Sequence, residues 1–153
     1  MTVANVNVKI ECTGLKAAKV TQIEAPNKMS STKLVFTGCK ITEGANCSVN
    51  AEIPTKELVA EVAIKAGKET EVKIKPKTGE TFANIEFKGE KCALFGTQPV
   101  KGTVVATDPE GTVEKVEQEL RLNTNTLEVG KNKATMTGAA TDSLKSLKPW
   151  SFS

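Results

Sequence analysis

The chain has no histidine, and among its 153 residues it has only two aspartates, Asp108 and Asp142. Catalytic triads, dyads and metal sites that use an imidazole are therefore excluded. Two aspartates are also too few for an acidic calcium loop. The remaining acidic residues are glutamates, and no motif singles out a pair of them for glycosidase chemistry. We therefore expect no catalytic residue, no cofactor and no metal site.

Aromatic side chains and arginine are scarce as well. Tyrosine is absent, and Arg121, Trp150 and five phenylalanines are the whole supply of these residue types. Proteins that read nucleic acid depend on arginine forks and stacking aromatic rings. The net charge is only +3, and lysine alternates with glutamate along stretches such as KELVAEVAIKAGKETEVKIKPK. This pattern is typical of a solvated surface, and we expect no nucleic-acid partner.

Long apolar runs are also missing. No run approaches the 18 residues that a membrane-spanning helix needs, so we expect no membrane insertion. The first residues, MTVANVNVKIEC, have neither the basic region nor the apolar region of a signal peptide. An exported protein would therefore need a leader that this sequence does not include.

The sequence is rich in two-residue alternation between apolar and polar side chains. Val6, Val8, Ile10 and Cys12 alternate with polar neighbours, and apolar residues recur at every second position over 58–64, 72–74, 83–87 and 120–122. Such alternation is typical of strands with one face in a core and the other in water. The many threonines and valines favour strands too.

Turn sequences follow one another at intervals of about 8–12 residues, and this spacing favours a sandwich or a barrel. We therefore predict one domain over 1–153, an all-β fold in which about ten to twelve short strands form an antiparallel β-sandwich or flattened β-barrel. A helix over 111–122 is the minor alternative, because Val113, Val116 and Leu120 have helical spacing. The strands are expected near 5–12, 18–24, 33–41, 47–53, 57–65, 69–75, 81–87, 91–95, 100–107, 116–123, 126–129, 133–138 and 143–152, and we expect some of these segments to merge into one strand.

The four cysteines lack the paired spacing of a zinc site. Cys39 and Cys47 flank the turn-like segment KITEGAN, so we expect a hairpin disulfide between them and a second disulfide between Cys12 and Cys92. Four cysteines allow three pairings, and Cys12–Cys39 is the main alternative. Disulfides persist in oxidising compartments, which predicts an extracellular or cell-surface location.

Several segments resemble a group of uncharacterised secreted proteins found mainly in actinobacteria. The matching segments follow in order along most of the chain: VKIEC, LVFTGCKITEGANCSVN, IPTKELVAEV, TGETFANIEFKGEKC, GTQPVKGTV and MTGAATDSLKSLKPWSF. The chain differs from that group in its high content of lysine and glutamate. The resemblance implies an extracellular all-β domain without catalytic residues.

Trp150 is the one candidate ligand contact that the sequence offers. A lone tryptophan near the end of a chain more often closes the end of a core than stacks on a sugar, and we expect Trp150 to turn inward. We predict a non-enzymatic, exported structural or binding module whose partner is a cell-surface polymer or a protein. The alternatives are a carbohydrate-binding module and a subunit of a capsid, tail or pilus-like assembly.

Overall fold

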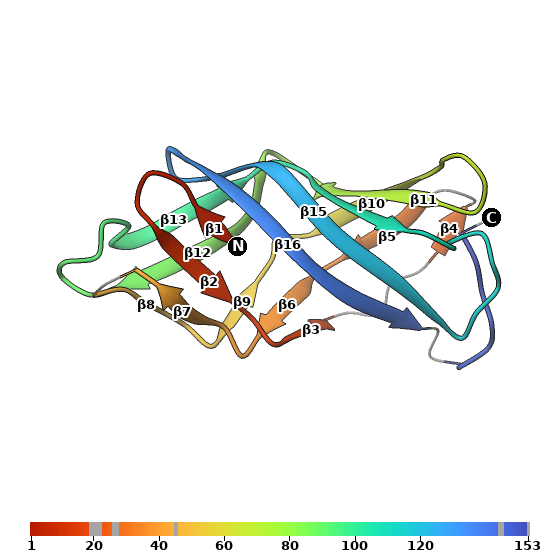
Figure 1. Ribbon diagram of the computed structural model, residues 1–153, viewed down its shortest axis with the longest axis horizontal. Helices are drawn as coiled ribbons and strands as arrows, with labels where there is room; N and C mark the ends of the chain where they lie inside the picture. Colours follow the sequence, from red (N-terminus) through yellow and green to blue (C-terminus); the bar gives the residue numbers. More distant parts are fainter. Residues whose placement is uncertain (19–22, 26–27, 45, 144–145, 153) are drawn as a thin grey trace.

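The computed structural model describes residues 1–18, 23–25, 28–44, 46–143 and 146–152 (Figure 1). These residues form strands and turns and contain no helix, so the all-β prediction is confirmed and the helix alternative over 111–122 is wrong. No helix in this part of the chain is long and apolar enough to cross a membrane. The strands are β1 (Thr2–Val3), β2 (Val8–Glu11), β3 (Gly14–Ala17), β4 (Ile23–Ala25), β5 (Lys28–Thr32), β6 (Leu34–Thr37), β7 (Lys40–Glu43), β8 (Ser48–Val49), β9 (Glu52–Pro54), β10 (Leu58–Ile64), β11 (Thr70–Pro76), β12 (Thr81–Lys88), β13 (Gly96–Lys101), β14 (Val104–Asp108), β15 (Glu117–Val129) and β16 (Asn132–Ser143).

The long β15–β16 hairpin crosses the molecule diagonally and organises the antiparallel sheets (Figure 1). From β15 one arm runs through β14, β11, β10 and β5, and from β16 another runs through β1 and β2 to β7. A third arm leaves the far end of β15 through β13 and β12 to β8. The strands β3, β6 and β9 form a separate small sheet. The large sheet is nearly closed and barrel-like, as the predicted flattened barrel requires.

The core follows from the alternation in the sequence. In β12, Ala83, Ile85 and Phe87 are buried while Asn84 and Glu86 are exposed. The main core gathers such residues from both ends of the chain, from Val3 and Val8 to Leu127 and Val129. A smaller core cluster at the other end of the molecule contains Val72, Ala106, Trp150 and Phe152.

Two predicted strands are absent from the described residues, at 91–95 and at 143–152, and three more, at 33–41, 47–53 and 100–107, each span parts of two separate strands. The segment 91–95 is a turn, in which the Cys92 amide donates to the Gly89 carbonyl and the Phe95 amide donates to the Cys92 carbonyl. In the segment 143–152, β16 ends at Ser143, and the described residues beyond it keep only one bridge, between Trp150 and Lys115. The predicted strands 116–123 and 126–129 merge into β15. Part of the predicted strand 18–24 lies outside the described residues.

The cysteine pairing expected from the sequence is also wrong. The disulfides are Cys12–Cys39, the alternative considered above, and Cys47–Cys92. β7 does not pair with β8 across the turn: it pairs with β2, and the Glu11–Lys40 register places Cys12 beside Cys39. β8 pairs with the end of β12, which brings Cys47 near Cys92.

Candidate functional site

The candidate site lies where the edges of β3 and β16 face each other, a region that we call the seam. β3 pairs with β6 along one edge, and β16 pairs with β15 along its whole length. The other edge of β16 pairs with β1 only at Ala134 and Thr135. Within the described residues no strand pairs with the outer edge of β3 or with the outer edge of 138–143. The small sheet and the large sheet therefore meet here without a backbone ladder.

A cavity of about 370 Å³ lies beneath the seam. Its mouth is formed by exposed residues of the two strands, including Leu15, Gly138 and Ala139. Its floor is apolar and buried, and it comes from four strands that are far apart in the sequence. The floor residues are Ile10, Ile53, Phe82, Ala83, Ile85 and Val100. Apolar cavities of this size are typical of small-molecule sites, which usually occupy about 300–1,000 Å³.

A second cavity of about 180 Å³ continues along the seam toward the C-terminal end of β16. Leu15, Leu122, Ala140 and Thr141 line both cavities, so the two spaces share a wall. The second cavity is lined by Val72, Ala106 and Phe152 from the smaller core cluster, and also by Asp142. The seam therefore offers a long apolar space with a carboxylate near one end.

The local sequence explains why this space is open. Residues 134–141, ATMTGAAT, carry no charge, although a quarter of the chain is charged. Gly138, Ala139 and Ala140 are too small to fill the space between the two sheets. Most natural edge strands are protected by charged residues or proline, and 138–141 has neither. The Cys12–Cys39 disulfide, whose Cys12 lines the larger cavity, holds the start of β3 against the main sheet.

Asp142 is half-buried, and burial raises the pKa of its carboxyl group above the usual value, although a hydrogen bond with the Ser143 backbone opposes the shift. No ion pair joins Asp142 to a cation of the described residues. Lys16 lines the same cavity, but its Nζ lies 2.7 Å from Glu52 Oε1 on the exposed side of β3. Among the described residues, therefore, no cationic side chain neutralises the charge of Asp142 in this cavity.

Trp150 is 8% exposed, so it turns inward as expected and presents no open indole face to a sugar. Its ring packs edge-on against Phe152, with centroids 4.9 Å apart. Gln118, which is fully buried, donates from Nε2 to the Trp150 carbonyl oxygen at 2.6 Å. The sequence reading missed Gln118, although it occupies the same face of β15 as Leu120 and Leu122. Trp150 closes one end of the core, whereas the seam lies along one side of the core.

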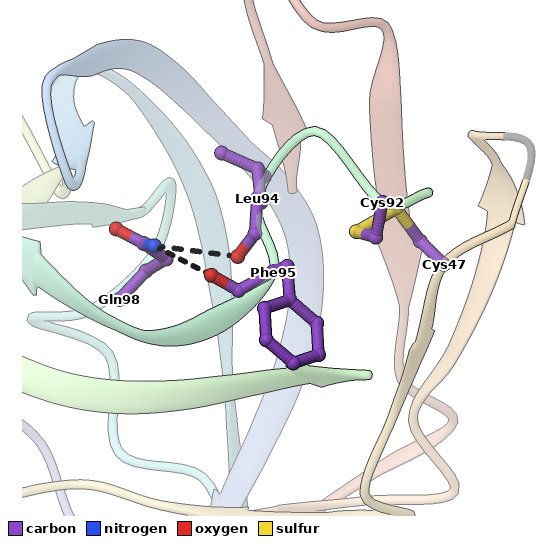
Figure 2. Close-up of a disulfide and its surroundings, with 5 residues drawn as sticks. All are labelled: Cys47, Cys92, Leu94, Phe95 and Gln98. Atoms are coloured by element: carbon purple, nitrogen blue, oxygen red, sulfur yellow. Dashed lines mark hydrogen bonds between the residues drawn. A yellow bond between two sulfur atoms is a disulfide. The ribbon is translucent and has the colours of Figure 1, made fainter. Parts of the chain in front are cut away.

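Phe95 is a separate surface feature, with 63% of its area exposed. Figure 2 shows the loop that carries it: Cys92 is bonded to Cys47, and Gln98 Nε2 donates to the carbonyl oxygens of Leu94 and Phe95. Leu94 is buried beside them. The loop is thus held by a disulfide, by two hydrogen bonds from Gln98 and by a buried side chain. Single exposed apolar residues are nevertheless common on protein surfaces. Phe95 alone does not define a site.

Comparison with known proteins adds no assignment, because no family model, curated protein or solved structure matches this chain. In the described residues no group of three or more histidine, cysteine, aspartate or glutamate side chains is placed to hold a metal ion. The site therefore has to be interpreted from its own chemistry, which is apolar, small and bordered by unpaired strand edges.

Proposed function

We propose that the protein is an exported, non-enzymatic binding module that takes up the apolar part of a ligand through the seam. The observation that carries this proposal is the cavity of about 370 Å³ with a buried apolar floor and an exposed mouth. Transfer of apolar surface from water into such a space contributes roughly 25 cal/mol per Å². The two disulfides favour an oxidising compartment, which supports export and a location outside the cell.

The lining supports binding rather than catalysis. The side chains around the larger cavity are aliphatic, thioether, aromatic, threonine or disulfide-bonded cysteine, and the titratable group that a lining residue carries, the α-amino group of Met1, donates to the Ile10 carbonyl oxygen at 2.8 Å. Acid–base chemistry needs a titratable group within hydrogen-bonding distance of the substrate. A cavity of this composition retains a ligand by shape and desolvation.

Binding of a fluorescent apolar probe tests this function. We expect N-phenyl-1-naphthylamine to become strongly fluorescent with the wild-type protein and to saturate at one equivalent. Ala140 lines both cavities, so the indole of Ala140→Trp should occupy the space where they adjoin and weaken probe binding at least about tenfold. Thr135→Trp, on an exposed position of the same strand, is the matched control and should leave binding unchanged. Equal binding by both variants would place the probe elsewhere and reject the site.

A subunit of a larger assembly is the second candidate function, and the unpaired edges of β3 and β16 favour it. Such edges can accept a strand from another chain. A solution mass measurement separates the two functions, because a binding module should remain monomeric at concentrations where an assembly subunit forms oligomers. The carbohydrate-binding alternative has no comparable support, since Trp150 is buried.

A further inference from the structure

Asp142 gives the seam a chemical preference beyond its apolar character. It stands on β16 directly after Ala140 and Thr141, which line both cavities, and it lines the smaller one itself. Its strand partner on β15 is Gln118, a neutral residue. The carboxylate therefore adjoins an apolar space without a cation from the described residues to neutralise it.

We propose that the seam binds an amphiphile with a cationic amine head, whose aliphatic tail lies in the larger cavity and whose ammonium group lies beside the Asp142 carboxylate. This rests on the proposed apolar-binding function and specifies its ligand class. The ligand must pass Leu15 and Ala140, which border both cavities. An ammonium ion would add charge-assisted hydrogen bonds to the backbone hydrogen bond that Ser143 already gives the carboxylate.

Charge complementarity favours a cation over an anion. The cationic side chain at the smaller cavity, Lys16, is already paired with Glu52, whereas Asp142 has no such partner in the described chain. The pKa of Asp142 is raised because burial disfavours the charged carboxylate, and a bound cation would stabilise that charge. A group kept at a cost to stability is characteristic of a binding site.

The net charge of the protein makes the inference testable. At +3 the overall field attracts anions, so a preference for a cation has to come from the local site. Decylamine, decanol and decanoate share one tail and differ in the head. Decylamine is protonated at pH 7, because an alkylamine such as the lysine side chain has a pKa of about 10.4.

The experiment measures how each of the three compounds displaces N-phenyl-1-naphthylamine. We expect decylamine to act at a concentration about tenfold lower than decanol, and decanoate to be the weakest. Asp142→Asn should abolish the advantage of decylamine while decanol and the probe bind as before, which also shows that the variant is folded. Asp142→Ser should lose the same advantage. The matched control Glu117→Gln removes an exposed carboxylate on the neighbouring strand and should change nothing.

Two results would overturn the inference: decanoate binding as tightly as decylamine, or Asp142→Asn keeping the preference for the amine. In either case, displacement by decanol would still support the proposed function, because decanol tests the apolar cavity alone. If neither the probe nor decanol binds, the proposed function itself fails.

Discussion

The surroundings of the Asp142 carboxyl group disfavour its charged form. Burial is the main cause of its raised pKa, and the backbone hydrogen bond at Ser143 compensates only in part. The sequence marked Asp142 as one of two aspartates but gave no reason to single it out. Its role depends on the cavity beside it, and this cavity is formed by residues that lie far away along the chain.

Asp142→Asn should therefore raise the stability of the unliganded protein at pH 7. The pKa of Asp142 is higher in the folded state than its ordinary value of 3.8, which applies to the unfolded state. The free energy of unfolding therefore falls as the pH rises from 3.8 through the raised pKa of the folded state. Below 3.8 the carboxyl is protonated in both states, and the difference between Asn and Asp should vanish. Urea unfolding of wild type and Asp142→Asn at pH 7 and at a pH below 3.8 measures this difference in stability, with Glu117→Gln as the control. An equal shift at both pH values would contradict the assigned cause.

Trp150 is a residue whose placement could be predicted from the sequence, because a lone tryptophan near a chain end often closes a core. Trp150→Ala should destabilise the protein by about 3–5 kcal/mol, since it removes a buried indole that packs on Phe152. Thermal or urea unfolding measures the loss. Leu147→Ala, at a position with 67% exposure, should change the midpoint little. Wild-type emission that is solvent-like and readily quenched by iodide would be inconsistent with this placement.

At the scale of elements, alternation in the sequence predicts strands well but does not predict their partners. β10, β11 and β12 fall close to the expected ranges because apolar residues recur at every second position in each of them. The segment KCALF is a short apolar run like that of a buried strand, but it forms a turn beside a disulfide. The chain changes sheets at Gly38 and Cys39, between β6 and β7, where Gly38 has a φ of 61°. A glycine in a strand-like segment often marks a bend, but it does not tell which sheet the next strand joins.

Peptide mapping without reduction tests this change of sheet. We expect cross-linked peptides that join Cys12 to Cys39 and Cys47 to Cys92. In the chain-entropy model, loops with separations of 27 and 45 residues contribute about 3.5 and about 4 kcal/mol. Mild reduction should therefore lower the unfolding midpoint substantially. A Cys39–Cys47 cross-link would mean that β7 and β8 form the hairpin first expected from the sequence and that β2 and β7 are not paired.

At the scale of the whole molecule, the seam arises because β3 of the small sheet and β16 of the large sheet lie side by side without pairing in the described part of the chain. The sequence predicts an antiparallel sandwich or flattened barrel, and this class is correct. It does not reveal the seam, since the walls come from β2, β3, β6, β12 and β16. The one local signal was the uncharged run 134–141, which could have indicated that this part of β16 is specialised.

The most direct test of the seam is an amide chemical-shift titration of the ¹⁵N-labelled wild-type protein with decanol. We predict saturable shifts confined to residues around the two cavities, with the largest at Leu15, Leu122 and Ala140, which line both. Shifts centred on exposed apolar residues away from the seam, such as Ile64, Phe95 or Leu147, would contradict the account, and so would the absence of saturable shifts.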